Sequence, residues 1–243
     1  MAVSRDEVLG RQSRRQRGDY NQAVTLPIVR KLAEANFPTR WGQFRIYGFE
    51  GEFPVKSNGH SGPLAREGKG ERRKETAVAL VMGDIHTAPA LVRIHSQCLT
   101  GDVFGSMRCD CRQQLELALQ MIADAGAGIL LYEQQEGRGI GLMAKLKAYE
   151  LQDHGRDTVE ANVELGFAAD CRGFEPPAEI LKKLGVTALR LITNNPEKVA
   201  ALEAVGIQVV ERVSAEVEPN ETFQRYLQTK QDKMGHLFDN MPK

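Results

Sequence analysis

Three of the four cysteines in the 243-residue sequence lie close together: Cys98, Cys109 and Cys111. Thiolates are soft ligands that suit zinc, and three protein ligands leave the fourth tetrahedral position open for water. Zinc-bound water ionises near neutral pH, so this spacing favours a hydrolytic metal site. Two alternatives stay open here. One is buried free thiols, and the other is a structural metal completed by His95, although its place on a predicted strand turns it away from Cys98.

Two further segments could bind an anion. Glu136-Gly137-Arg138 follows an apolar run, and glycine lets the backbone approach a ligand closely. Thr193 ends another apolar run, Asn195 and Pro196 suit a helix N-cap and first turn, and Lys198 follows. A helix N-terminus with a hydroxyl and a lysine can hold phosphate. The alternatives are a surface arginine in a turn and ordinary helix capping.

Asp170 and Arg172 stand two positions apart, and Tyr149 lies in a predicted helix. An acid beside an arginine could act on a substrate or form a surface ion pair, and the tyrosine could belong to a core. Cys171 is predicted to be an unliganded thiol. No paired metal-binding spacing occurs among the other histidines, so none receives a catalytic role: His60, His86, His154 and His236.

The elements that must position these residues follow from periodicity. Apolar alternation or short apolar runs predict strands over 41–49, 77–84, 89–97, 128–133, 188–193 and 207–213. Helical spacing and terminal glycines predict helices over 111–125, 142–154, 177–184, 196–205 and 221–236. This alternation predicts an α/β (mixed α+β) fold, a mixed sheet flanked by helices with the zinc site at the strand and loop ends.

The chain is predicted to contain a single main domain over residues 30–236. Residues 1–29 and 237–243 are expected to be tails, the first of them disordered. Residues 51–75 are rich in glycine, proline, serine and charge, which predicts a long polar insert loop.

Charge and hydropathy exclude some classes of partner. Lys and Arg (32) balance Asp and Glu (32), so no overall field would attract nucleic acid or a membrane. Residues 1–75 are basic, with 15 Lys/Arg against 9 Asp/Glu, which we interpret as a solvated tail and loop. We find neither a transmembrane run nor a signal-peptide pattern, which predicts a cytoplasmic protein with reduced thiols.

Taken together, several motifs resemble the GTP cyclohydrolase II family of riboflavin biosynthesis. The resemblance covers about residues 30–50 and 77–236, and its motifs occur in the family's order. They are Arg93 to Asp102, Arg108 to Cys111, Glu136 to Arg138, Asp157 to Asn162, Gly166 to Asp170, and Thr193 to Pro196.

The resemblance implies a reaction and its participants. GTP would lose C8 of its guanine as formate and also pyrophosphate, leaving 2,5-diamino-6-hydroxy-4-(5-phosphoribosylamino)pyrimidine. One Zn²⁺ per chain and Mg²⁺ with the triphosphate are implied cofactors, and a homodimer is implied. Because the sequence has little room for the synthase domain that is often fused upstream, we expect a monofunctional chain.

The resemblance also implies residue roles. Asp170 would be the proton acceptor, Arg172 the nucleophile, and Tyr149 would serve the deformylating step. An arginine nucleophile is chemically awkward because its pKa lies above about 12. The zinc ligands would be Cys98, Cys109 and Cys111, and the GTP site would comprise Arg93, Ile94, His95, Ser96, Gln97, Gln114, Glu136, Gly137, Arg138, Thr158, Thr193 and Lys198.

The sequence departs from the family at residues 1–29, at residues 51–75, and at Cys171, where an acid is expected. Two rival hypotheses remain. A paralogue could open the ring and stop at the formylated pyrimidine, or a zinc-stabilised nucleotide- or nucleic-acid-binding module could lack catalysis. Tyr149 argues against the first, and the neutral net charge argues against the second.

Overall fold

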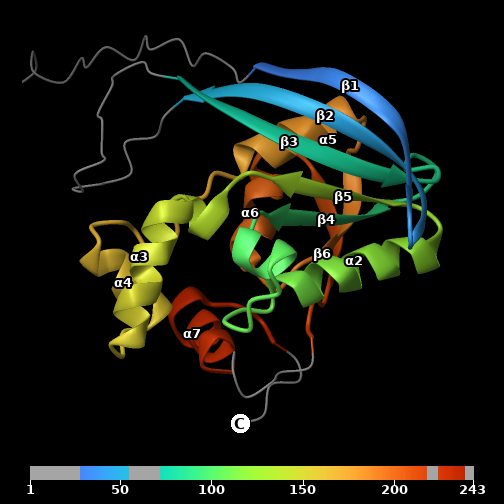
Figure 1. Cartoon of the computed structure of the whole chain (residues 1–243). Helices are drawn as coiled ribbons and strands as arrows, with labels where there is room; N and C mark the ends of the chain where they lie inside the picture. Colours follow the sequence, from blue (N-terminus) through green and yellow to red (C-terminus); the bar gives the residue numbers. More distant parts are fainter. Residues whose placement is uncertain (1–27, 55–71, 218–223, 239–243) are drawn as a thin grey trace, which may run out of the picture.

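A mixed sheet of seven strands organises the computed structural model, which describes residues 28–54, 72–217 and 224–238 (Figure 1). Its order is β1-β2-β3-β5-β4-β6-β7, antiparallel from β1 to β5 and parallel from β5 to β7. The strands are β1 (Ile28–Thr39), β2 (Gly42–Pro54), β3 (Arg72–Met82), β4 (Ala90–Ser96), β5 (Gly128–Glu133), β6 (Ala188–Ile192) and β7 (Gln208–Val213).

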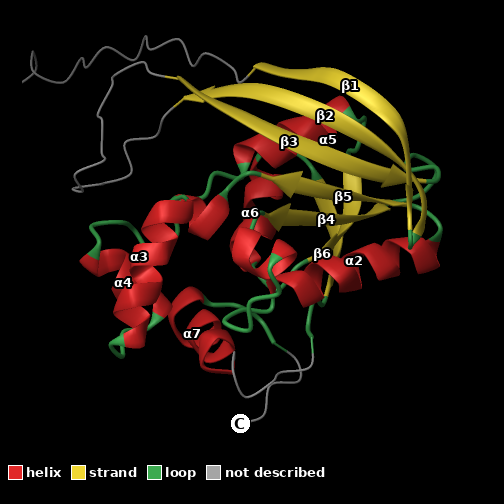
Figure 2. Ribbon diagram, viewed as in Figure 1, coloured by secondary structure: helices red, strands yellow, loops and turns green. Residues whose placement is uncertain are grey.

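Helices cover both faces of this sheet and also lie beyond the strand ends (Figure 2). They are α2 (Cys111–Ala125), α3 (Leu142–Asp153), α4 (Thr158–Glu164), α5 (Glu175–Lys183), α6 (Pro196–Ala204) and α7 (Gln224–Met234), with short turns η1 (Leu99–Val103) and η2 (Glu136–Gly139).

Two apolar cores form because neighbouring residues of a strand point to opposite faces. On β5, Ile129 and Leu131 pack in the core that contains Leu181 of α5 and Leu202 of α6. Leu130 packs on the other face, in the core that contains Ile122 of α2. This arrangement confirms the predicted mixed sheet with flanking helices.

The polar insert predicted over residues 51–75 is wrong at both ends. Strand β2 extends to Pro54 and β3 begins at Arg72, with Gly51 paired to Glu75. Phe53 fills the core, so one face of this polar segment is buried. Residues 55–71 lie outside the described part of the chain.

The predicted tails also need correction, because β1 begins at Ile28 and Val29 is buried. Residues 1–27 lie outside the described chain. At the other end, the Leu237 amide donates to the Asn194 carbonyl, and residues 239–243 are not described. Strand β1 was not predicted, because most of its side chains are exposed and its sequence therefore lacks apolar alternation.

Within the described residues, no helix is long and apolar enough to cross a membrane.

Candidate active site

A pocket lies where the parallel strands end. The residues that follow β4, β5 and β6 all contribute to it, including Gln97, Gln135 and Thr193. Ligands bind beyond the carboxyl ends of strands in sheets of this kind. The pocket is therefore located where the fold favours a binding site.

Three thiols meet in the lining of this pocket. The Sγ atoms of Cys98, Cys109 and Cys111 all lie within 4.8 Å of one another, and those of Cys98 and Cys109 are 3.7 Å apart. Sulfurs bound tetrahedrally to zinc at about 2.3 Å would be about 3.8 Å apart. A Cβ on Gly101 would come within 3.0 Å of the Cys109 sulfur, so glycine keeps the space between the thiols open. This cluster could hold a metal ion.

The environment of Cys98 favours the thiolate that a metal requires. Hydrogen bonds from the Cys109 and Cys111 thiols, and then the ammonium of Lys145, hold the pKa of Cys98 far below its usual range. The Lys145 Nζ lies 3.1 Å from the Cys98 sulfur and 2.7 Å from Glu136 Oε1. Lys145 therefore places a positive charge beside the sulfurs.

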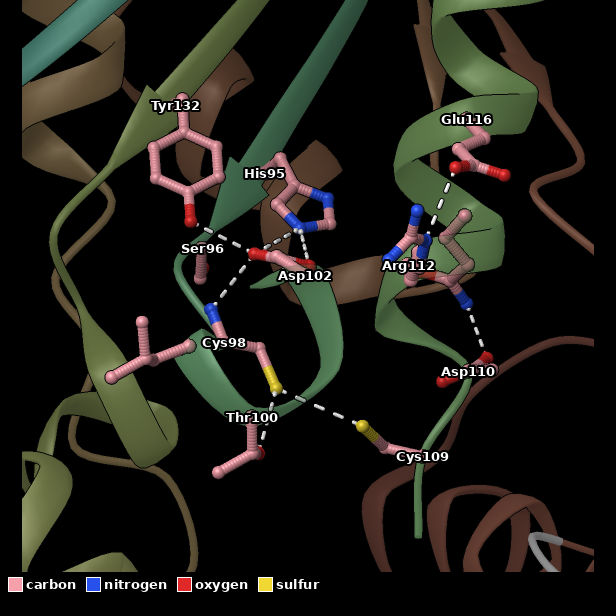
Figure 3. A network of polar contacts seen from close by, with 12 residues as sticks. His95, Ser96, Cys98, Thr100, Asp102, Cys109, Asp110, Arg112, Glu116 and Tyr132 are labelled. Carbon is pink, nitrogen blue, oxygen red and sulfur yellow. Dashed lines mark hydrogen bonds and ion pairs between the residues drawn. The ribbon is translucent and has the colours of Figure 1, made fainter. Parts of the chain in front are cut away.

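Asp102 fixes the loop that carries the first cysteine (Figure 3). It accepts hydrogen bonds from the Cys98 backbone amide at 3.0 Å and from the Tyr132 hydroxyl at 2.8 Å. The His95 Nε2 atom lies 3.2 Å from Asp102 Oδ1. His95 is thus tied to a carboxylate and is absent from the thiol cluster, as its strand position predicted.

The turn after β5 brings Arg138 into the pocket. Arg138 adopts φ +59°, a left-handed conformation that non-glycine residues rarely adopt and that often marks a functional site. Its Nη2 donates to Thr158 Oγ1 at 3.3 Å, while the buried Nη1 finds no partner among the described residues. The strained turn therefore presents a guanidinium N–H to the pocket.

Asp170 and Arg172 form a largely buried pair, with side chains 15% and 12% exposed. Arg172 Nε donates to Asp170 Oδ1 at 2.9 Å and Nη2 donates to Oδ2 at 2.5 Å. Burial opposes the charge of Arg172, but the Asp170 carboxylate outweighs it and raises the pKa of Arg172. The surface ion pair that the sequence left open is therefore excluded by burial.

Lys198 lies in the first turn of α6, where Asn195 caps the helix by accepting from the Glu197 amide at 2.9 Å. It is buried, and its Nζ donates to the Ile94 carbonyl at 2.9 Å. Burial, and then repulsion by Arg172, lowers the pKa of Lys198 to about 7. An anion in the pocket would favour its protonated form.

Arg93 joins these cations from β4. Its Nη2 donates to Gln114 Oε1 at 2.6 Å and its Nη1 to the Ile192 carbonyl at 3.1 Å, while its Nε is buried without a partner in the described chain. Buried polar atoms are normally satisfied. Together with His95 Nδ1 and Arg138 Nη1, which are also unpartnered there, this atom is consistent with ligand binding.

Tyr149 lines the pocket near the sulfurs, so it is not a core aromatic. Its hydroxyl lies 3.1 Å from Thr100 Oγ1, which also accepts from Lys145. Burial raises the pKa of Tyr149.

The pocket brings together nearly every residue singled out in the sequence, with two exceptions. The Ile94 side chain packs in the core, although its carbonyl accepts from Lys198. Asp170 reaches the pocket only through Arg172. The lining includes Arg93, His95, Ser96, Gln97, Gln114, Glu136, Gly137, Arg138, Tyr149, Thr158, Arg172, Thr193, Lys198 and the three clustered cysteines.

The polar pocket residues that sequence reasoning missed include Lys145, Tyr226, Lys230 and His236. Lys145 stands four positions before Tyr149 on α3, a helical spacing that could have revealed it. The others lie on or just after α7, whose position against the pocket no local pattern predicts. His236, which received no role in the sequence, lies in the pocket wall.

Fold and site together define an α/β protein with a cationic ligand pocket and a thiol cluster that could hold a metal ion. The sequence profile described as GTP cyclohydrolase II matches residues 30–214, and the chain belongs to that family.

Characterised relatives agree with this assignment. GTP cyclohydrolase-2 of Escherichia coli is 51% identical over 87% of this chain and 98% of its own length. The riboflavin biosynthesis proteins RibBA of Chlorobium phaeovibrioides and Aquifex aeolicus are 51% and 50% identical over 86% and 87% of this chain. The chain spans about half the length of these RibBA relatives, 47% and 48%.

Proposed function

We propose that the protein hydrolyses GTP at the guanine ring and at the triphosphate, the first step of riboflavin biosynthesis. Formate and pyrophosphate would leave, giving 2,5-diamino-6-hydroxy-4-(5-phosphoribosylamino)pyrimidine. The observation that carries this proposal is one pocket lined both by three clustered thiols and by Arg138, Arg172 and Lys198.

The thiol cluster fits a zinc ion, held by Cys98, Cys109 and Cys111. Bound zinc would leave one coordination position open and supply the Lewis acidity that makes water nucleophilic near neutral pH. The chain's own contribution is to hold the thiolates: the Lys145 ammonium offsets their charge, and Asp102 fixes the Cys98 backbone. Tyr149, which lines the same pocket, would orient the ring or its formyl group.

Cationic side chains would bind the triphosphate, with Mg²⁺ neutralising part of its charge. We assign Lys198 to the outer phosphates and Arg172 to the α-phosphate, where water breaks the bond that releases pyrophosphate. Because Asp170 keeps Arg172 protonated, its guanidinium is better suited to stabilise negative charge than to act as a nucleophile. Asp170 orients that guanidinium and could accept a proton.

Incubation of purified protein with GTP and Mg²⁺ tests the proposal, with formate, pyrophosphate and pyrimidine absorbance followed separately. We expect all three signals. A pyrimidine spectrum without formate would indicate the paralogue that stops at the formylated product. Absence of any product would support the alternative that the protein is a nucleotide-binding module without catalysis. We also propose a homodimer, which light scattering would detect as twice the chain mass of 27.0 kDa.

A further inference from the structure

Helix α7 and the turn after it form one wall of the pocket, although the family profile ends earlier, at residue 214. Tyr226, Lys230, Met234 and His236 line the pocket from this segment. In Figure 1, α7 lies beside α3 and α4, beyond the strand ends. The proposed reaction assigns none of these four residues a role, so their position requires a separate explanation.

A buried ion pair fixes α7 to the loop that carries two of the clustered cysteines. Lys230 Nζ lies 2.8 Å from Asp110 Oδ1, and the side chains are 9% and 1% exposed. Asp110, between Cys109 and Cys111, also accepts from Gln114 Nε2 at 2.6 Å. Removing one partner of a buried pair leaves an uncompensated charge, which is strongly unfavourable. The helix is therefore fixed in this place.

Three more contacts fix the segment to α4 and to the turn before α6. Lys233 pairs with Asp157 and Glu160 at the start of α4. After α7, the Leu237 amide donates to the Asn194 carbonyl at 2.9 Å, beside the proposed phosphate-binding turn. His236 lies between these anchors, and its amide donates to the Lys230 carbonyl at 3.1 Å.

The charges that act most strongly on His236 are positive. Burial, and then the cations Lys230, Arg172, Arg138 and Lys198, lower the pKa of His236 to about 2. These cations come from α7, from the turns after β5 and before α5, and from α6. A neutral imidazole has one N–H donor and one acceptor, so it can donate to an anion without adding to the repulsion among the cations.

Tyr226 holds two of these cations in place. The Lys230 Nζ lies 4.3 Å from its ring centroid, and the Arg138 guanidinium carbon lies 5.9 Å from it. Cations are attracted to the face of an aromatic ring at these distances. Tyr226 is therefore a positioning residue.

We propose that His236 is a substrate-binding residue whose ring N–H donates to the phosphate chain of the nucleotide, and that α7 holds it there. This inference rests on the proposed function of the pocket as a GTP site.

Kinetics of three variants test it. His236→Ala should raise the KM for GTP about tenfold to a hundredfold, as expected for a hydrogen bond to a charged group, and leave kcat near the wild-type value. His236→Gln keeps an N–H donor and should recover part of the loss. Asp232→Asn, on the exposed side of α7, is the matched control and should behave as wild type.

Hydrogen exchange with the α,β-methylene analogue of GTP gives a readout that does not need turnover. The analogue should protect residues 224–238 in the wild type and much less in His236→Ala. For His236→Ala, an unchanged KM and the same protection as in the wild type would overturn the inference. A lower KM with reduced protection would also overturn it, because α7 would then obstruct the site. If the wild type released no formate, the proposed function would fail, yet analogue protection would still test His236.

Discussion

Arg172 and Lys198 carry the same charge in one pocket, yet their surroundings differ. The Nε and Nη2 atoms of Arg172 both donate to the Asp170 carboxylate, which raises the pKa of Arg172 against the opposing effect of burial. Lys198 donates instead to a neutral backbone carbonyl, and burial lowers its pKa to about 7. Arg172 is therefore always protonated, whereas the protonation of Lys198 near neutral pH depends on whether an anionic ligand is bound.

This difference predicts separate kinetic effects of removing each cation. Lys198→Ala should weaken GTP binding by roughly 1–3 kcal/mol, with a smaller change in turnover. Arg172→Ala should lower kcat much more than it changes KM, because its interaction strengthens in the transition state. Steady-state kinetics decide the matter. Near-normal turnover of Arg172→Ala would remove this residue from the mechanism.

The low pKa of Lys198 predicts that GTP binding depends on pH. Phosphate favours the protonated amine, so above pH about 7 binding must also take up a proton, and KM should rise by up to about tenfold per pH unit. Below that pH the amine is already charged, and this effect disappears.

Lys198→Arg is the matched control, because arginine stays charged throughout. KM measured from pH 6 to 9 for both proteins should diverge at high pH, while ionisation of GTP itself affects both equally. Parallel pH profiles would contradict the assignment of Lys198 to phosphate.

At the scale of elements, strands and helices with a buried face could be predicted closely. Strand β5 was predicted over 128–133 and is observed there, because five of its six residues are buried and Gly126 ends the preceding helix. The edge strand β1 and the short helix α4 could not be predicted by that means. Backbone pairing with β2 forms β1, and a capping box between Asp157 and Glu160 starts α4.

Close packing of the two loops that carry Arg138 and Arg172 predicts an unequal effect of two glycine substitutions. Gly139 and Gly141 both have φ +86°, but a Cβ on Gly139 would lie 2.8 Å from the Cys171 carbonyl, and one on Gly141 would meet nothing within 4 Å. Gly139→Ala should therefore cost roughly 1–3 kcal/mol more stability than Gly141→Ala. It should also lower kcat/KM by displacing Arg172.

Denaturant unfolding and kinetics of the two alanine variants provide the comparison. Equal stability losses would show that the loops relax at no cost, which would contradict a rigid contact between them.

At the scale of the whole molecule, the residues of the site fall into two groups. Some stand in short sequence motifs, and others are brought together from distant parts of the chain. The cysteines, Glu136 to Arg138 and Thr193 to Lys198 stand in short motifs at strand ends, so they could be predicted. Lys230 meets Asp110 across 120 positions, and the Leu237 amide donates to the carbonyl of the distant residue Asn194. Such contacts depend on tertiary packing, which local periodicity does not encode.

Three cysteines that converge in the fold predict about one tightly bound zinc per chain, measured by elemental analysis. Cys109→Ser should lose the metal. Cys171→Ser should retain it, since Cys171 lies outside the cluster. Zinc retained by the first variant, or lost from the second, would contradict the ligand set.

The most direct test of the central claim is the release of formate from GTP as a function of zinc content, with pyrophosphate measured in the same samples. Formate should rise in proportion to zinc as depleted wild-type protein is reloaded, and it should be absent for Cys109→Ser at every zinc level. Some pyrophosphate release should persist without zinc, because Arg172 and Lys198 lie outside the thiol cluster. Undiminished formate release from zinc-free protein would contradict the account.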